Sequence, residues 1–301
     1  MAENNIPRGP IPIQPQGQNP LAKHFRQPKI YLRLPSKGQY WPEGSIDMPD
    51  NGEVPVYSMT AKDELVLKTP DALINGESTV SLIKSCIPSI KDAYAVPSLD
   101  LDAILVAIRI ATYGESLTIT TKVPNTTPEL ERDYQVNLVE LLDSMQSRVF
   151  EDTFVSNGFT FKLVPNNYAQ FTKAALKAFE EQRLVKTIDE SNLDEAQKLE
   201  KFNASFKKLT DYNLDMVVDQ VISVQFQNED PVTNINHIRE FFEGTDGVIF
   251  EGLKNHLEKM KTEFNIKPLT VTTDEEERKA GAPDTFQVPI AFDQSNFFAR
   301  Q

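Results

Sequence analysis

The chain has 301 residues and a formal net charge of −13 at pH 7. This acidic balance argues against binding to nucleic acid, which requires a basic face, and no apolar run approaches the roughly 20 residues that cross a bilayer. The single cysteine, Cys86, excludes an internal disulfide and, with no secretion signal at the N-terminus, favours a reducing compartment.

Residues 1–28 are predicted to form a disordered, proline-rich arm. The segment is poor in large apolar residues, so it cannot bury enough surface to fold alone, and its prolines favour an extended backbone. Its basic residues, among them Arg8, Lys23 and Arg26, outnumber its single acid, Glu3. Two interpretations stay open: the arm is a disordered leader, or it becomes ordered on a neighbouring acidic subunit.

Residues 29–145 are predicted to form the first of two similar units, and a helix at 100–113 is its expected centre. This helix is apolar nearly all round and should be buried, and Gly114 follows it at the usual left-handed cap position. Arg109 is the lone charge in its central stretch. We expect this side chain to reach out along its aliphatic stem or to pair with a carboxylate such as Glu115.

The start of the first unit contains a predicted strand at 30–34 and a helix that Thr60 opens, with Asp63 at the reciprocal capping position. Trp41, the only tryptophan, lies between them. It is either a cap on the core or an anchor at an interface. A core cap is favoured, because aromatic side chains supply much of the buried area of small β elements.

Residues 146–208 are predicted to be an insertion that holds a strand, at 159–164, and a helical hairpin. The first helix of the hairpin covers about 166–184, and the second carries an apolar stripe that includes Phe202 and Phe206. This stripe either packs internally or joins onto a partner. Internal packing is favoured, since most such stripes are core.

Residues 209–301 are predicted to form the second unit, which is more polar than the first. Two aromatic residues, Phe297 and Phe298, lie almost at its end. We expect them either to pack into the second core or to be bound by a neighbouring subunit.

A tandem duplication is the clearest organisational signal. The pair LTITT at 117–121 and YQVNL at 134–138 recurs as LTVTT at 269–273 and FQVPI at 286–290, shifted by 152 residues. Each pair resembles a zinc-ribbon hairpin that has lost its ligands, so we predict no metal in either. The predicted fold is therefore α+β: a tandem duplication of a helical unit ending in a zinc-ribbon-like β-hairpin without metal ligands, with an inserted helical hairpin.

No catalytic, cofactor or metal site is predicted. The sequence lacks phosphate-binding glycine motifs, HExxH and GxSxG, and its three histidines, His24, His237 and His256, are too scattered for zinc. No carboxylate is nominated as an acid in an apolar pocket. We therefore expect a protein that is not an enzyme and that works through interfaces. The candidate interface residues are Arg8, Lys23, Arg26, Trp41, Phe202, Phe206, Phe297 and Phe298.

Five motifs follow one another over residues 30–142. They are YLRLPSKG at 31–38, PVYSMTAKDE at 55–64, KTPDALING at 68–76, IKSCIP at 83–88 and AIRIATYG at 107–114. Together they resemble the baseplate hub subunit and hub assembly family of T-even-like contractile-tailed phages. Many relatives carry cysteine pairs in the first hairpin loop, whereas this chain has KVPNTTP at 122–128.

The resemblance implies structural or assembly work in a phage tail, without catalysis. It implies a protein that is assembled in the host cytoplasm, lies in the virion tail baseplate and binds other baseplate or tail proteins in a hetero-oligomer. The alternative is a transient, non-virion assembly chaperone for hub proteins. A third interpretation, a degenerate zinc-ribbon protein that touches nucleic acid, is disfavoured by the acidic charge.

Overall fold

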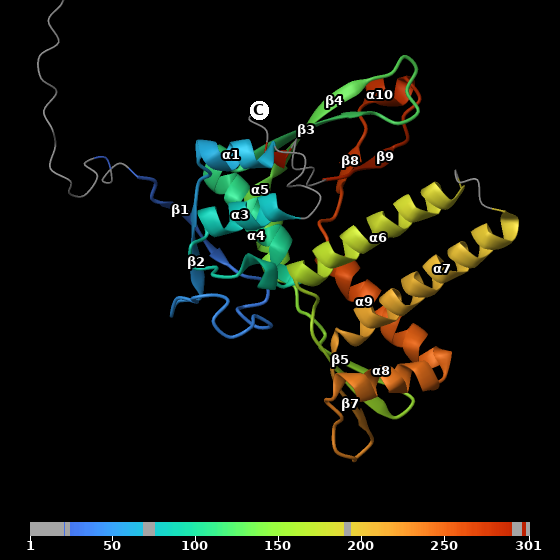
Figure 1. Cartoon of the computed structure of the whole chain (residues 1–301). Helices are drawn as coiled ribbons and strands as arrows, with labels where there is room; N and C mark the ends of the chain where they lie inside the picture. Colours follow the sequence, from blue (N-terminus) through green and yellow to red (C-terminus); the bar gives the residue numbers. More distant parts are fainter. Residues whose placement is uncertain (1–20, 22–24, 69–75, 190–193, 291–296, 299–301) are drawn as a thin grey trace, which may run out of the picture.

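The computed structural model describes residues 21, 25–68, 76–189, 194–290 and 297–298 (Figure 1). They form helices and small antiparallel sheets that enclose two hydrophobic clusters. This mixture confirms the predicted α+β class. Within the described part of the chain, no helix combines the length and the apolar character that a membrane span requires.

The first cluster is built from two strands and the helices that follow them. Its elements are β1 (Pro28–Arg33), β2 (Glu53–Tyr57), α1 (Ala61–Leu67), α3 (Glu77–Cys86), the short 3-10 helix η2 (Ala93–Ala95), α4 (Ser98–Tyr113) and α5 (Leu138–Gln146). Strands β1 and β2 are antiparallel, so that Leu32 lies opposite Val54, and both side chains are fully buried. Helix α1 begins where Thr60 and Asp63 form the predicted capping box.

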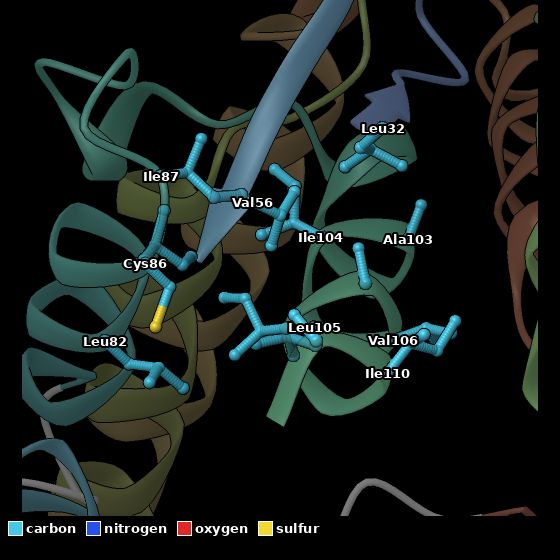
Figure 2. Close-up of a cluster of buried hydrophobic side chains, with 14 of the residues drawn as sticks. Leu32, Val56, Leu82, Cys86, Ile87, Ala103, Ile104, Leu105, Val106 and Ile110 are labelled. Carbon is cyan, nitrogen blue, oxygen red and sulfur yellow. The ribbon is translucent and has the colours of Figure 1, made fainter. Parts of the chain in front are cut away.

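Helix α4 is the centre of this cluster. Eleven of its 16 residues are buried, because β1, β2, α3 and α5 all pack against it. Gly114 ends the helix with a φ of 96°, a conformation that a residue without a Cβ adopts at little cost. Figure 2 shows side chains of α4 meeting those of β1, β2 and α3; the labelled residues are Leu32, Val56, Leu82, Cys86, Ile87, Ala103, Ile104, Leu105, Val106 and Ile110.

Two β-ribbons follow the long helices α4 and α9. The first joins β3 (Ser116–Lys122) to β4 (Glu131–Asn137), and the second joins β8 (Leu269–Thr272) to β9 (Thr285–Val288). Their registers match: Leu117 lies opposite Val136 and Leu269 lies opposite Val288, and the two pairs are separated by the 152-residue shift of the sequence repeat. The ribbons thus share one register, while their common ancestry stays a prediction.

The loops of the two ribbons differ. The loop at 123–130 is irregular, whereas the loop of the second ribbon contains the short helix α10 (Glu275–Lys279). Asp274 and Glu277 form a capping box at the start of α10. This capping box stabilises the start of the helix in a loop that is rich in acidic residues.

The second cluster lies against a three-stranded antiparallel sheet of order β5-β6-β7. Its elements are β5 (Thr153–Ser156), β6 (Phe159–Leu163), β7 (Val221–Phe226), α8 (Ile235–Gly244) and α9 (Gly247–Phe264). Phe161 of β6 is fully buried and lies 5.8 Å from Phe242 of α8, measured between ring centroids. Leu253 of α9 is also fully buried in this cluster.

The predicted boundary between the insertion and the second unit lies within a continuous helix. Strand β6 lies in the predicted insertion, 146–208, but it pairs with β7 of the predicted second unit, 209–301. The boundary between residues 208 and 209 falls inside helix α7 (Glu195–Val218). Sheet hydrogen bonds and one continuous helix therefore join the insertion to the second unit. Helix α7 lies beside α6 (Tyr168–Asp189), and the two project from the rest of the molecule (Figure 1).

Candidate interaction surfaces

The described histidines and the cysteine are not arranged for metal binding or nucleophilic catalysis. In the ranges that the structure covers, no three His, Cys, Asp or Glu side chains are grouped to hold a metal ion. His237 is exposed on α8, and a ring nitrogen of His256 lies 3.1 Å from the carbonyl oxygen of Glu151; His24 lies outside the described residues. Burial raises the pKa of the Cys86 thiol to about 12, so it stays protonated at neutral pH.

The two ribbons pack against each other (Figure 1). Tyr134 of β4 and Phe286 of β9 meet edge to face, with their ring centroids 6.0 Å apart. These two residues are related by the 152-residue shift, so equivalent positions of the two ribbons are in contact. Contact between equivalent residues is the arrangement expected around a two-fold axis.

Polar contacts join the loops of the ribbon pair. The guanidinium of Arg132 lies 3.2 Å from the carboxylate of Glu276 and 3.5 Å from that of Glu277. At the loops, the backbone N–H of Thr127 donates to the carbonyl oxygen of Ala280 at 2.9 Å. The contacting faces of the two ribbons are thus occupied by each other.

Helices α6 and α7 bury a seam between them and leave further apolar side chains exposed. Phe202 is half-buried beside the fully buried Ser205, whereas Phe206, four residues further on, is 60% exposed. Phe202 is thus partly withdrawn from solvent, whereas Phe206 lies mostly in solvent. A salt bridge of 3.9 Å between Lys208 and Glu181 links the two helices. The other exposed large apolar residues of the hairpin are Phe171, Leu176, Phe179, Leu184 and Leu199.

The last part of the predicted arm is fixed on its own chain. The guanidinium of Arg26 donates to the carbonyl oxygens of Ser58 and Ser85, the latter at 2.5 Å, and lies 3.6 Å from the carboxylate of Asp63. Arg26 is therefore occupied within this chain. Arg8 and Lys23 lie outside the described residues, and their role as interface residues stays a prediction.

Trp41 caps the first cluster through a buried carboxylate. Its indole N–H donates to Asp100 at 2.8 Å, and the backbone N–H of Ser36 donates to the same carboxylate at 2.7 Å. Burial raises the pKa of Asp100 to about 6, although the donors of Ser36 and Trp41 pull it down. The ring of Trp41 is partly buried against the first cluster, in agreement with the favoured prediction of a core cap.

Phe297 and Phe298 are buried in the first cluster of their own chain. This corrects the expectations that they pack into the second core or are bound by a neighbouring subunit. They lie near Arg109 of α4, whose guanidinium is 6.0 Å from the Phe297 ring and 4.7 Å from the Tyr113 ring. Arg109 is only 1% exposed, and its Nε and Nη1 have no hydrogen-bond partner among the side chains and backbone described. The expectations that Arg109 reaches out or pairs with Glu115 are therefore wrong. Burial lowers the pKa of this guanidinium.

A groove of about 580 Å³ lies between the two clusters, lined by residues of α4, α6, α7 and α9. Most of its walls are apolar, but Asp102 and Asn166 also line it. Burial raises the pKa of Asp102 to about 6, and the charge of Arg148 opposes this shift. Sequence reasoning missed both residues, because one acid on an apolar helix and one Asn before a helix are ordinary in sequence. Their shared groove exists only in the folded chain.

A family model described as "T4 bacteriophage base plate protein" matches residues 28–286, which is most of the chain. No curated protein and no solved structure matches the chain.

Proposed function

Because the chain belongs to the family of T4 bacteriophage base plate proteins, we propose that it is a structural or assembly component of the baseplate hub. In this role it works in the virion tail by docking to other baseplate proteins, without catalysis, after assembly in the host cytoplasm. The observation that carries the docking mechanism is the exposed apolar surface of the helical hairpin. The alternative, a transient chaperone, differs in whether the chain stays in the particle.

The hairpin surface has the composition of a protein interface. Phe171, Phe179, Leu199 and Phe206 are each more than half exposed. Aromatic residues, phenylalanine among them, are enriched at protein interfaces relative to the rest of the surface. Large exposed apolar patches on soluble proteins mark interaction sites. The hairpin also projects from the rest of the molecule, so a partner reaches it without displacing either cluster (Figure 1).

We also propose that the two ribbon units arose by tandem duplication. The shared register of the ribbons and the contact between Tyr134 and Phe286 support this proposal. Two similar units offer two similar outer faces to neighbouring subunits, which suits a protein that joins rings of different symmetry. We expect neither ribbon to hold a metal, and elemental analysis that finds stoichiometric zinc would contradict this.

The test compares two phenylalanines of the same helix. Phe206→Ser removes an exposed apolar ring, so we expect the melting temperature to stay nearly unchanged while incorporation into phage particles falls several-fold. Phe202→Ser is the matched control, because Phe202 is half-buried on the same helix and its loss should lower the melting temperature. Incorporation is measured by quantitative mass spectrometry of purified particles from infected cells.

Two results would count against the proposal. Normal incorporation of the Phe206→Ser chain would exclude the hairpin surface as a docking site. If purified particles contain every other baseplate protein but not this chain, the chain acts as a transient chaperone and not as a permanent subunit.

A further inference from the structure

We infer that one face of the helical hairpin, the face that carries Phe206, binds the same face of a second copy of this chain in an antiparallel two-fold dimer. This inference rests on the proposed function, because it uses the hairpin surface proposed for docking and names the first partner of that surface. The dimer is then the unit that the other baseplate proteins meet.

Helices α6 and α7 each turn a less exposed side toward the other. On α6 this side holds Gln170, Ala174, Glu181 and Val185, and on α7 it holds Lys198, Phe202, Ser205, Leu209 and Tyr212. Two contacts between the helices identify it. A carboxylate oxygen of Glu181 lies 3.9 Å from the ammonium of Lys208. The ammonium of Lys177 lies 4.7 Å from the centre of the Tyr212 ring.

A second stripe on each helix is rotated by one residue from this contact side. It consists of Phe171, Ala175, Ala178 and Gln182 on α6 and of Leu199, Asn203, Phe206, Thr210 and Asn213 on α7, and all nine are exposed. One residue turns an α-helix by about 100°. Because α6 and α7 run in opposite directions, both stripes turn toward the same side of the pair. We call these nine residues the open face.

The open face carries no charge, in a hairpin that is itself nearly neutral. Helices α6 and α7 together contain eight basic and seven acidic residues, which leaves 23 basic and 37 acidic residues for the rest of the chain. The first charge along the α6 stripe is Lys186, one turn beyond Gln182. Two copies of the chain therefore repel each other through their acidic bodies but not through their hairpins.

The shape of the open face differs between its two ends. The contacts of Lys177 and Lys208 set Ala178 beside Thr210, so small side chains lie at the centre. Phe206, one turn from Thr210 toward the tip of the hairpin, is 60% exposed. About one turn from Thr210 in the other direction, Asn213 lines the groove of about 580 Å³.

The groove thus continues the open face at the base of the hairpin. Phe171 of the open face and Val217 of α7 line it together with Asn213. The other lining residues include two acids and two bases, Asp102, Glu258, Lys254 and Lys261. Their charges balance, and the rest of the wall is mostly apolar, so the groove suits an uncharged ring better than an ion.

A two-fold axis at the centre of the open face brings each projecting ring to the groove of the other copy. An interface between identical faces requires a projection and a recess at equal distances on opposite sides of the axis. Phe206 and the groove meet this condition about Thr210. The antiparallel arrangement also holds the two acidic bodies at opposite ends, because the hairpin projects from the rest of the molecule (Figure 1). This self-complementarity and the neutral hairpin favour a second copy over a different protein.

The open face is large enough for a stable dimer. Helix α6 has 22 residues and is therefore about 33 Å long, and two helices side by side are about 20 Å wide. The flat footprint is about 650 Å², and the relief of the side chains adds to it. Stable interfaces bury about 800 Å² of each partner. Leu176 and Leu184 lie on other sides of α6 and stay exposed in this dimer.

Sedimentation equilibrium of the complete chain and two variants tests the inference. We expect the parent chain to form dimers, and we expect Phe206→Glu to raise the dissociation constant by about 30-fold or more. Leu184→Glu is the matched control, because Leu184 is also exposed but lies on the opposite side of α6. It should leave the dissociation constant unchanged. A parent chain that is monomeric at every concentration, or equal effects of the two variants, would overturn the inference.

Cross-linking with a short bis-maleimide locates the contact. The native Cys86 is buried, so single cysteines at other positions react selectively. Thr210→Cys should yield covalent dimers, because Thr210 lies at the two-fold axis. Lys201→Cys should not, because the nine residues between the two positions make two and a half turns and place Lys201 on the opposite side of α7. Dimers that form as readily through Lys201→Cys would assign self-association to another face.

The proposed function and this inference fail in different ways. A chain that is monomeric in solution but is incorporated into particles, with a loss for Phe206→Ser, keeps the docking proposal and overturns the dimer. A chain that dimerises through the open face but is absent from particles keeps the dimer and contradicts the permanent subunit.

Discussion

Helices α4 and α9 precede the two ribbons at equivalent places in the chain, but they are buried to very different extents. Eleven of the 16 residues of α4 are buried, compared with five of the 18 residues of α9. Strands and helices pack around α4 from several sides, whereas α9 packs on the sheet with one face and leaves the other in solvent. Two helices at equivalent places in the chain therefore need not contribute equally to the stability of the fold. The surrounded helix supplies stability, and the half-exposed helix supplies surface.

The largest expected effect comes from truncating one leucine in each helix. Leu105 and Leu257 are related by the 152-residue shift, and each is 7% exposed. We expect Leu105→Ala to lower the free energy of unfolding by about 4 kcal/mol and Leu257→Ala by about 2 kcal/mol. The second value is smaller because Leu257 lines the groove, where the site can relax or admit water. Denaturant unfolding measures both, and equal losses would contradict the comparison.

A second prediction concerns the buried carboxylate that α4 carries and α9 lacks. The residue equivalent to Asp100 in α9 is Gly252. The pKa of Asp100 is raised to about 6, so the folded chain holds this proton more tightly than the unfolded chain, and the contribution of Asp100 to stability is lost as the pH rises through 6. Trp41→Phe removes one hydrogen bond to the ionised form. We expect it to cost about 2 kcal/mol at pH 8 and less at pH 5.

Thermal and denaturant unfolding at the two pH values measure the effect of Trp41→Phe. An equal loss at both would show that Trp41 stabilises the cluster by packing alone. Gly252→Ser, at the equivalent place in α9, serves as a control that introduces no titratable group and should show no dependence on pH.

The smallest effect concerns the ribbons, where the two regions are alike rather than different. Tyr134 and Phe286 occupy equivalent positions and touch edge to face. We expect a double-mutant cycle with Tyr134→Leu and Phe286→Leu to give a coupling energy of about 1 kcal/mol. A coupling near zero would mean that the two ribbons pack independently.

Local signals were enough to predict several elements. The helix expected at 100–113 is found at Ser98–Tyr113, and Gly114 ends it as its backbone conformation requires. The capping box of Thr60 and Asp63 is also confirmed. These features depend on residues within a few positions of one another, and such interactions are readable in sequence.

Long-range pairing was not predictable in the same way. Strand β7 (Val221–Phe226) was not anticipated, because a short apolar segment becomes a strand through the neighbour that it pairs with, here β6. The boundary predicted at residue 208 falls inside helix α7, and β6 pairs with β7 across it. Phe297 was assigned to the second unit by its position in the chain, whereas its contacts lie in the first cluster.

The candidate surfaces were predictable only in part. The apolar stripe of the hairpin was visible in the sequence, but only the folded chain separates Phe202 on the seam from Phe206 in solvent. The groove was missed entirely, because Asp102 and Asn166 are far apart in the sequence and neither belongs to a motif. A site formed by four helices and a connecting segment leaves no spacing pattern to detect.

The burial of Phe297 and Phe298 bears on how the protein matures during translation. Most of the first cluster comes from residues that leave the ribosome early, whereas Phe297 and Phe298 follow all the other buried residues of the cluster in the chain. Until they arrive, the nascent chain presents apolar atoms and the cation of Arg109 to its surroundings, and such surfaces attract chaperones and proteases. A chain truncated before Phe297 would keep this apolar surface exposed to solvent. The first cluster therefore closes only after translation has passed Phe298.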